Sequence, residues 1–145
     1  MGIQSVCVKD IRNIFLVILL LSFSGNAHAM FWVVYWRGAD SDSYYDPSTI
    51  RQVDGGVEVD VLTDFNGVIE RPKGVKVMSM SGFERYNCSD ETFSFVTVEV
   101  WDAPMASGKL VNSIKKSTVT DVPIAAGTNS AALFEILCHK AIKSN

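Results

Sequence analysis

The chain has 145 residues, a formal net charge of −3 at pH 7 and a hydrophobic content of 48%. This length suits one domain and is short for two. The mildly acidic balance argues against broad binding to nucleic acid or to anionic membranes.

The N-terminal segment has the pattern of a secretory signal peptide. Lys9 and Arg12 form a basic start, residues 14–21 are an unbroken apolar run, and residues 27–29 read Ala-His-Ala, a small-x-small cleavage site. The apolar run is too short to span a bilayer as a stable helix. We therefore predict that residues 1–29 are removed and that the remainder has no membrane span.

Residues 30–145 are expected to form one exported domain without an N-terminal lipid anchor. No cysteine follows the cleavage point directly, and Cys7 lies in the segment that is removed. Loss of two basic residues and one acidic residue would change the net charge from −3 to −4. We expect a periplasmic, secreted or cell-surface protein.

Two cysteines remain after cleavage, Cys88 and Cys138. An exported chain with two cysteines is expected to oxidise them to one disulfide. In the chain-entropy model, closing a loop of roughly fifty residues stabilises the fold by about 4 kcal/mol. That is a large share of the roughly 5–15 kcal/mol by which a small domain is stable.

The N-terminal half of the domain reads as a series of strands. Residues 31–37 are dense in aromatic and β-branched side chains, which favours a first strand. A polar loop over 38–43 precedes an extended segment, 44–53, in which Pro47 indicates an edge strand or a break. Asp54-Gly55-Gly56 then predicts a hairpin turn, because such turns need positive φ.

The strand after this turn alternates cleanly between apolar and acidic residues. Val57, Val59 and Val61 are expected to face the core, while Glu58 and Asp60 face water. Two carboxylates on one strand could form a glycosidase pair. The simpler interpretation is the wet face of a half-buried strand.

A long hairpin is predicted to be the spine of the fold. Asn66-Gly67 marks a turn, and residues 70–74 form a charged loop with two breakers. Residues 78–88 read as a strand that ends at a cysteine. A short polar turn then leads to a second strand over 92–101.

The second strand of this hairpin carries apolar residues on both faces. Strict alternation would put Phe93, Phe95 and Trp101 on one face and Val96, Val98 and Val100 on the other. We therefore expect a central strand that is covered on both sides. The C-terminal helix would supply one cover, and a curled part of the sheet or a second molecule the other.

The C-terminal part is predicted to add a strand and a helix. Residues 109–117 read as a strand and residues 119–124 as a short extended piece; one of Thr128, Asn129 and Ser130 can then cap a helix that runs to about Ile142. One face of this helix is apolar and contains Leu133, Phe134, Leu137, Cys138 and Ala141. The predicted fold is α+β: a single antiparallel β-sheet of about six strands, with a C-terminal helix packed on it and tied by the disulfide.

No catalytic, metal or cofactor site is predicted. His139 is the only histidine left after cleavage, and neither a GxSxG elbow nor a second histidine or free cysteine accompanies it. Asp40, Asp42 and Asp46 could bind calcium weakly, but their spacing differs from that of an EF-hand loop, so a solvated loop is preferred. We therefore predict a protein that is not an enzyme.

Several motifs follow one another along the domain in a characteristic order: Trp36, the segment 44–50, the valine-rich strand up to Leu62, Glu84 four residues before Cys88, Val122-Pro123 and Cys138. Together they resemble the surface-adhesin protein E family. The resemblance implies a small antiparallel sheet with a disulfide-tied C-terminal helix. It also implies an outer-membrane adhesin that binds host matrix and serum proteins, such as vitronectin and laminin, and that can form a homodimer.

The chain departs from that family in two ways. The family's adhesin is a lipoprotein, whereas this chain lacks the lipidation cysteine. The adhesin's binding region is also rich in basic residues, and the nearest counterparts here are Arg71, Lys73, Lys76 and Arg85.

We predict an exported, non-enzymatic binding protein with a protein partner. The candidate partner-binding residues are Arg71, Lys73, Lys76, Arg85, Tyr44 and Tyr45; tyrosines are favoured at binding surfaces. The alternative is a periplasmic inhibitor of a cell-wall-degrading enzyme such as lysozyme, because small disulfide-stapled β domains also serve that role.

Overall fold

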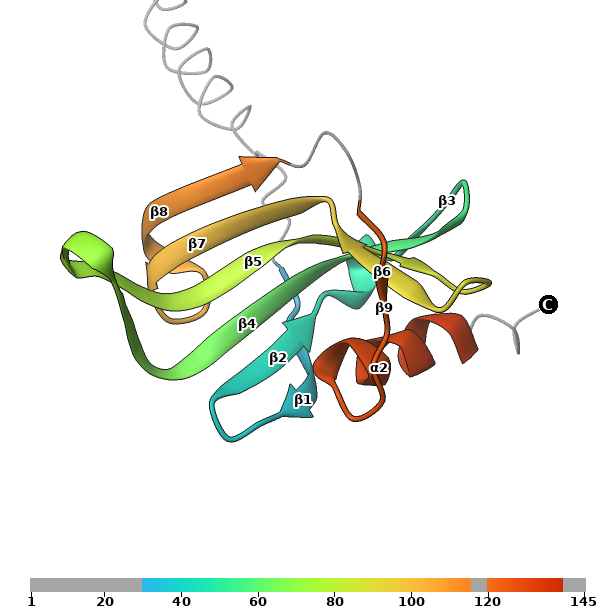
Figure 1. Cartoon of the computed structure of the whole chain (residues 1–145), viewed down its shortest axis with the longest axis horizontal. Coiled ribbons are helices and arrows are strands. Elements are labelled where there is room, and N and C mark those ends of the chain that lie inside the picture. Colours follow the sequence, from blue (N-terminus) through green and yellow to red (C-terminus); the bar gives the residue numbers. More distant parts are fainter. Residues whose placement is uncertain (1–29, 116–119, 140–145) are drawn as a thin grey trace, which may run out of the picture.

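The structure, a computed structural model, describes residues 30–115 and 120–139 (Figure 1). The predicted signal peptide and the predicted end of the C-terminal helix lie outside the described residues. The described strands are β1 Val33–Arg37, β2 Ser41–Tyr45, β3 Arg51–Val53, β4 Gly56–Arg71, β5 Val75–Asn87, β6 Thr92–Phe95, β7 Thr97–Ala103, β8 Ser107–Lys115 and β9 Val122–Pro123. Two 3₁₀ turns, η1 Pro47–Thr49 and η2 Pro72–Gly74, precede a C-terminal helix made of α2 Asn129–Phe134 and its continuation η3 Glu135–His139.

The fold class is confirmed: one antiparallel sheet carries one C-terminal helix. In the described part of the chain the sheet has nine strands, in the order β1-β2-β4-β5-β6-β9, with β3 paired to β4 and β7 placed between β5 and β8. About six strands were expected. The difference arises because η1 divides the segment 44–53 into β2 and β3, a bend divides 92–101 into β6 and β7, and β9 forms within 119–124.

The break at Pro47 has a clear local cause. Asp46 is buried, and its carboxylate accepts hydrogen bonds from the backbone N–H of Ser48 (2.9 Å) and of Phe31 (3.0 Å). The first of these caps η1, where Pro47 needs no N–H partner. The chain therefore turns once before it re-enters the sheet as β3.

The long strands β4 and β5 form the centre of the sheet. Their register runs from Val57↔Tyr86 to Asp64↔Ser79 and resumes at Ile69↔Val77 after an irregularity. The turn predicted at Asn66-Gly67 is therefore wrong: these residues belong to a bulge within β4. Hydrogen bonding to the β1–β2 loop keeps the strand extended there, since the N–H of Asn66 donates to the carbonyl of Asp40 at 2.9 Å.

One face of the sheet forms the main core under the C-terminal helix. Its buried members are Val57, Val59 and Val61 of β4, Tyr86 of β5, and Leu133, Phe134, Leu137 and Cys138 of the helix. The hydroxyl of Thr128 caps α2 by accepting the N–H of Ala131 (3.2 Å), as one of the predicted caps. The disulfide Cys88–Cys138 ties the end of β5 to this helix, with the two Cα atoms 5.6 Å apart.

A bend at Val96 separates β6 from β7 and changes which side chains share a face. Phe95 pairs with Glu84, whereas Trp101 pairs with Ser79, on the opposite face of β5. The strict alternation predicted for 92–101 is therefore wrong, because Val96 interrupts the ladder. The bend passes so close to β5 that a Cβ on Gly82 would lie 2.0 Å from the carbonyl oxygen of Thr97.

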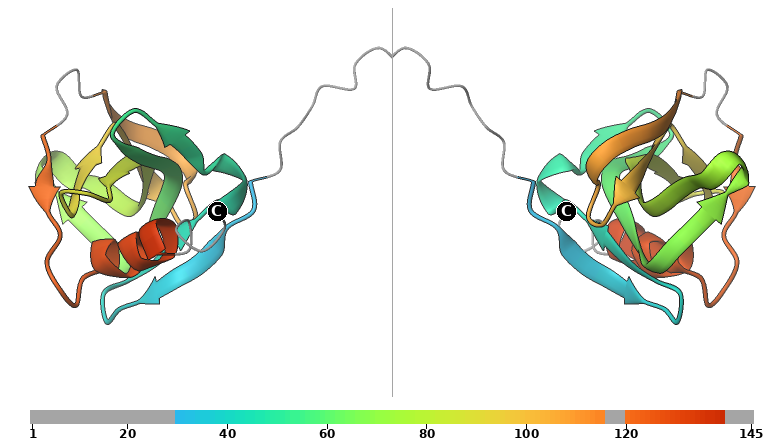
Figure 2. Two further views of the ribbon diagram at one scale, coloured as in Figure 1. Left: turned by 90° about the vertical axis from the view of Figure 1, so that its right-hand side faces the viewer. Right: turned by 90° about the vertical axis from the view of Figure 1, so that its left-hand side faces the viewer.

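The second face of the sheet is also buried within this single chain. Leu62 and Ser79 are fully buried and Val77 is 3% exposed, and the indole N–H of Trp101 donates to the hydroxyl of Ser81 at 3.0 Å. In the end-on views of Figure 2 the strands curl around the core, with the helix across one side. The curled sheet therefore supplies the second cover.

Candidate protein-binding surface

The predicted basic residues of the 70–74 loop lie at a projecting end of the molecule. Arg71, Lys73 and Lys76 are all exposed and lie around η2, which joins β4 to β5 far from the C-terminal helix (Figure 1). In the register, Glu70 pairs with Lys76. We call this feature the basic tip, defined by residues 70–76.

The tip has a tight backbone shape. Pro72 begins η2, and Lys73 and Gly74 both have positive φ, of 67° and 72°. A left-handed lysine costs about 1 kcal/mol relative to glycine. A Cβ added at Gly74 would meet nothing within 4 Å, so there is open space beside this glycine.

The strand β8 lies beside the basic tip. It pairs with β7 along one side and with no other strand in the described part of the chain. Leu110 is 42% exposed and Ile114 is 45% exposed, and Lys109 and Lys115 are also exposed. An open groove separates β8 from the tip; it is lined by Gly74, Val75, Lys76, Asp102, Lys109, Leu110 and Val111.

The turn between β7 and β8 is anchored to the central strands, which fixes the position of β8. Met105 and Ala106 both have positive φ. Their backbone N–H groups donate to Oδ1 of Asp64 (2.8 Å) and to Oγ of the buried Ser79 (2.9 Å). The Ser79 hydroxyl in turn donates to the carbonyl of Ala103 at 2.6 Å. These bonds hold a strained turn against β4 and β5.

Arg85 and the tyrosines do not join this surface. Arg85 lies within β5, where its guanidinium pairs with the carboxylate of Glu58. Tyr44 and Tyr45 are half-buried in β2, opposite Leu62 and Val61. The structure therefore brings together three of the six predicted partner-binding residues, all in the basic tip.

The prediction that Glu58 faces water on β4 is wrong. Glu58 is 3% exposed and bridges Arg85 and Arg51, whose Nε donates to Oε2 at 2.9 Å. Burial raises the pKa of Glu58, but the bonds from Arg85 and Arg51 outweigh it and hold this pKa below its usual value. Asp60 is only half-buried, and burial together with the charge of Asp46 raises its pKa to about 6. Because Arg51 and Arg85 both pair with the carboxylate of Glu58, this network stabilises the sheet and leaves that carboxylate no role in catalysis.

Glu84, named above only as part of a motif, is a buried carboxylate whose burial was not predicted. It is 8% exposed, and the hydroxyl of Tyr86 donates to its Oε2 at 2.7 Å. Burial raises the pKa of Glu84 to about 7, against the lowering effect of the Tyr86 hydrogen bond. The signal was available, because residues 84 and 86 share one face of a strand.

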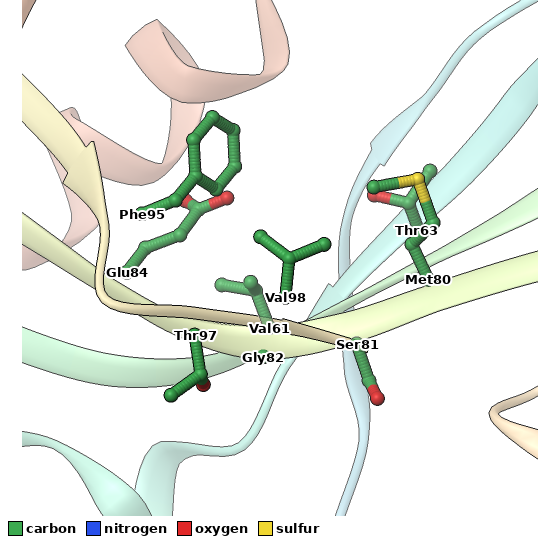
Figure 3. Close-up of a pocket in the computed structure, with 9 residues that line it drawn as sticks. All are labelled: Val61, Thr63, Met80, Ser81, Gly82, Glu84, Phe95, Thr97 and Val98. Carbon is green, nitrogen blue, oxygen red and sulfur yellow. The ribbon is translucent and has the colours of Figure 1, made fainter. Parts of the chain in front are cut away.

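The cavity beside Glu84 is too small for a substrate. It has a volume of about 30 Å³ and is lined by Val61, Thr63, Met80, Ser81, Gly82, Glu84, Phe95, Thr97 and Val98 (Figure 3). Such a space holds about one water molecule. The arrangement therefore belongs to the core and offers no binding pocket.

The predicted calcium carboxylates are not brought together as ligands. Asp42 pairs with Arg37 at 2.8 Å, and Asp46 is buried under η1. Among residues 30–115 and 120–139, no group of three or more His, Cys, Asp and Glu side chains is placed to hold a metal ion. In the same ranges no helix is long and apolar enough to cross a membrane. The side chain of His139 lies outside the described part.

Comparison with known proteins gives consistent matches. The family model described as surface-adhesin protein E matches residues 32–139. A crystal structure of protein E from non-typeable Haemophilus influenzae superposes with a TM-score of 0.59 at 14% identity, covering 83% of each chain. A second structure of Haemophilus influenzae protein E gives 0.58 at 15% identity, covering 79% of this chain and 88% of that one. No curated protein matches the chain.

Proposed function

Because the chain belongs to the surface-adhesin protein E family, we propose that it is an exported, non-enzymatic adhesin that binds a host matrix or serum protein. The observation that carries this proposal is the match of one adhesin family model to residues 32–139. That range includes both the disulfide-tied core and the basic tip.

The shape of the domain supports binding through an exposed surface. Two buried carboxylates, Glu58 and Glu84, are paired within the domain, and the cavity beside Glu84 is too small for a substrate. The basic tip, in contrast, presents exposed cations on a chain whose net charge is negative. A partner with an acidic surface patch fits that distribution.

The proposal includes export through the predicted signal peptide, residues 1–29, and display at the cell surface. Protease treatment of intact cells tests this, because a surface protein is cleaved while a periplasmic one is protected until the outer membrane is opened. A protein that is found only in the periplasm would overturn the adhesin proposal. Homodimer formation is part of the proposal and is measured by sedimentation velocity.

Binding is tested with the protein purified as exported, against immobilised vitronectin, laminin and lysozyme. We expect binding to a matrix or serum protein, and a weaker signal for K73Q than for R37Q, which removes an exposed charge far from the tip. Inhibition of lysozyme without binding to matrix proteins would instead support the cell-wall-enzyme inhibitor.

A further inference from the structure

The outer edge of β8 is an open stretch of backbone. β8 has nine residues, about 30 Å at the usual rise per residue, and pairs with β7 alone among the described strands. Alternate N–H and C=O groups on the far side of such a strand are left without sheet partners. A segment of another chain could satisfy them as a tenth strand.

Other edges of the described sheet are short or covered. β3 has three residues, and β9 has two and contains Pro123, which cannot donate to a ladder. β1 has five residues and contacts α2. β8 is longer than these, contains no proline, and exposes Leu110 and Ile114 beside its backbone.

The charges along β8 select the kind of strand that can pair with it. Lys109 and Lys115 lie on β8, one on each face of the strand because of the register shift at Val111. Asp102 of β7, on the inner side of β8, already accepts the backbone N–H of Lys109 through Oδ1 at 2.7 Å. Lysines on an edge oppose pairing with uncharged or basic strands. A strand that carries carboxylates would relieve this repulsion.

We propose that the outer edge of β8 accepts an extended acidic segment of a partner protein by strand addition. The inference rests on the proposed function, since it names the surface and the chemistry by which a protein partner is held. The partner's backbone pairs with β8, and its carboxylates lie near Lys109 on one face of the strand and near Lys115 on the other. Its apolar side chains cover Leu110 and Ile114, which also lie on opposite faces because of the register shift at Val111. A second copy of this chain fits less well, because pairing two β8 edges would gather four lysines.

The first test uses two fluorescein-labelled octapeptides, (Glu-Glu-Val-Val)₂ and (Lys-Lys-Val-Val)₂, which carry charged and apolar residues on both faces of an extended strand. Each is titrated with the full exported protein and followed by anisotropy. We expect the acidic peptide to bind and the basic one, matched in length and apolar content, not to bind. Higher salt should weaken binding. Equal binding of the two peptides would overturn the inference.

The backbone contribution is tested on the peptide, so that the fold of the protein is left intact. Two versions of (Glu-Glu-Val-Val)₂ are N-methylated, one at the odd-numbered positions and the other at the even-numbered positions. In strand addition only one set of N–H groups faces β8, so one version should lose binding and the other should keep it. Equal effects of both would overturn strand addition.

Protein variants locate the site. K109Q/K115Q should weaken peptide binding about tenfold, since it removes two exposed charges that attract the carboxylates. R37Q, on the far edge, should leave binding unchanged. If no acidic peptide binds while a matrix protein still does and K73Q weakens it, the edge inference fails and the proposed function stands. A dimer that tightens in K109E, together with no peptide binding, would assign the edge to a second copy.

Discussion

The hydroxyl of Tyr86 donates to Oε2 of Glu84 at 2.7 Å, and both side chains are buried in the same chain. Among the residues that the structure describes, no lysine or arginine shifts the pKa of this carboxyl. The pair therefore leaves a titratable acid in the core without a compensating cation. Three other contacts in the structure also give measurable consequences.

We predict that rising pH destabilises the protein through Glu84. The folded-state pKa is about 7 against an ordinary value of 4.5, so the stabilisation is complete below about pH 4.5 and is lost as the pH rises to about 7. The shift corresponds to about 3 kcal/mol. Urea unfolding at pH 5 and pH 8 measures it, with E84Q as the comparison. E84Q should remove most of the difference, and an unchanged pH dependence would contradict the assignment.

Glu58 should act in the opposite pH range. Its pKa is lowered by Arg85 and Arg51 despite burial, so its contribution is present above the ordinary pKa and is lost as the pH falls through the lowered one. We expect E58Q to cost about 2 kcal/mol at pH 7, because two partly exposed arginines lose their shared partner. Acid unfolding of the wild type and E58Q should converge at low pH; a constant gap would argue against an electrostatic origin.

Gly82 is predicted to be required by the close approach of the β6–β7 bend. A Cβ there would lie 2.0 Å from the Thr97 carbonyl, whereas one at Gly67 would meet nothing within 4 Å. We expect G82A to destabilise the fold by about 3 kcal/mol and G67A, the matched control, to change it little. Thermal unfolding of both variants measures the difference, and equal effects would show that the bend can move aside.

The disulfide should contribute about 4 kcal/mol, since it closes a loop with a separation of 50 residues. C88S/C138S should unfold at correspondingly lower urea concentration than the oxidised wild type. Reductant should shift the wild type toward the variant and leave the variant unchanged. Mass spectrometry of the non-reduced protein should detect no free thiol in the exported domain, and two free thiols would contradict the bond.

Local patterns predicted much of this fold. The alternation of Val57, Val59 and Val61, the Asp54-Gly55 hairpin and the apolar helix face were all correct, because each depends on neighbours in sequence. The burial of Glu58 could not be predicted in this way, because it depends on Arg51 and Arg85, which lie next to Glu58 only once the strands have paired. The bulge at Asn66 likewise depended on a partner loop.

The candidate surface was predicted only in part, for the same physical reason. Pro72, Gly74 and the charged residues between strands indicated a loop at 70–74, so its exposed cations could be predicted from the sequence. Arg85 was grouped with them because it is basic, although its strand position turns it toward Glu58. The position of β8 at an edge depends on the order of the strands in the sheet, and the residues of β8 alone do not reveal that order.

The disulfide places β8 inside a closed covalent ring. Cys88 and Cys138 are joined, and β6, β7, β8 and β9 all lie between them in sequence. A single proteolytic cut in the β7–β8 turn would therefore leave both fragments covalently joined through the sulfur bridge. The fragments would separate only after reduction, whereas a cut in the β1–β2 loop, outside the ring, would release the N-terminal segment once the fold is opened.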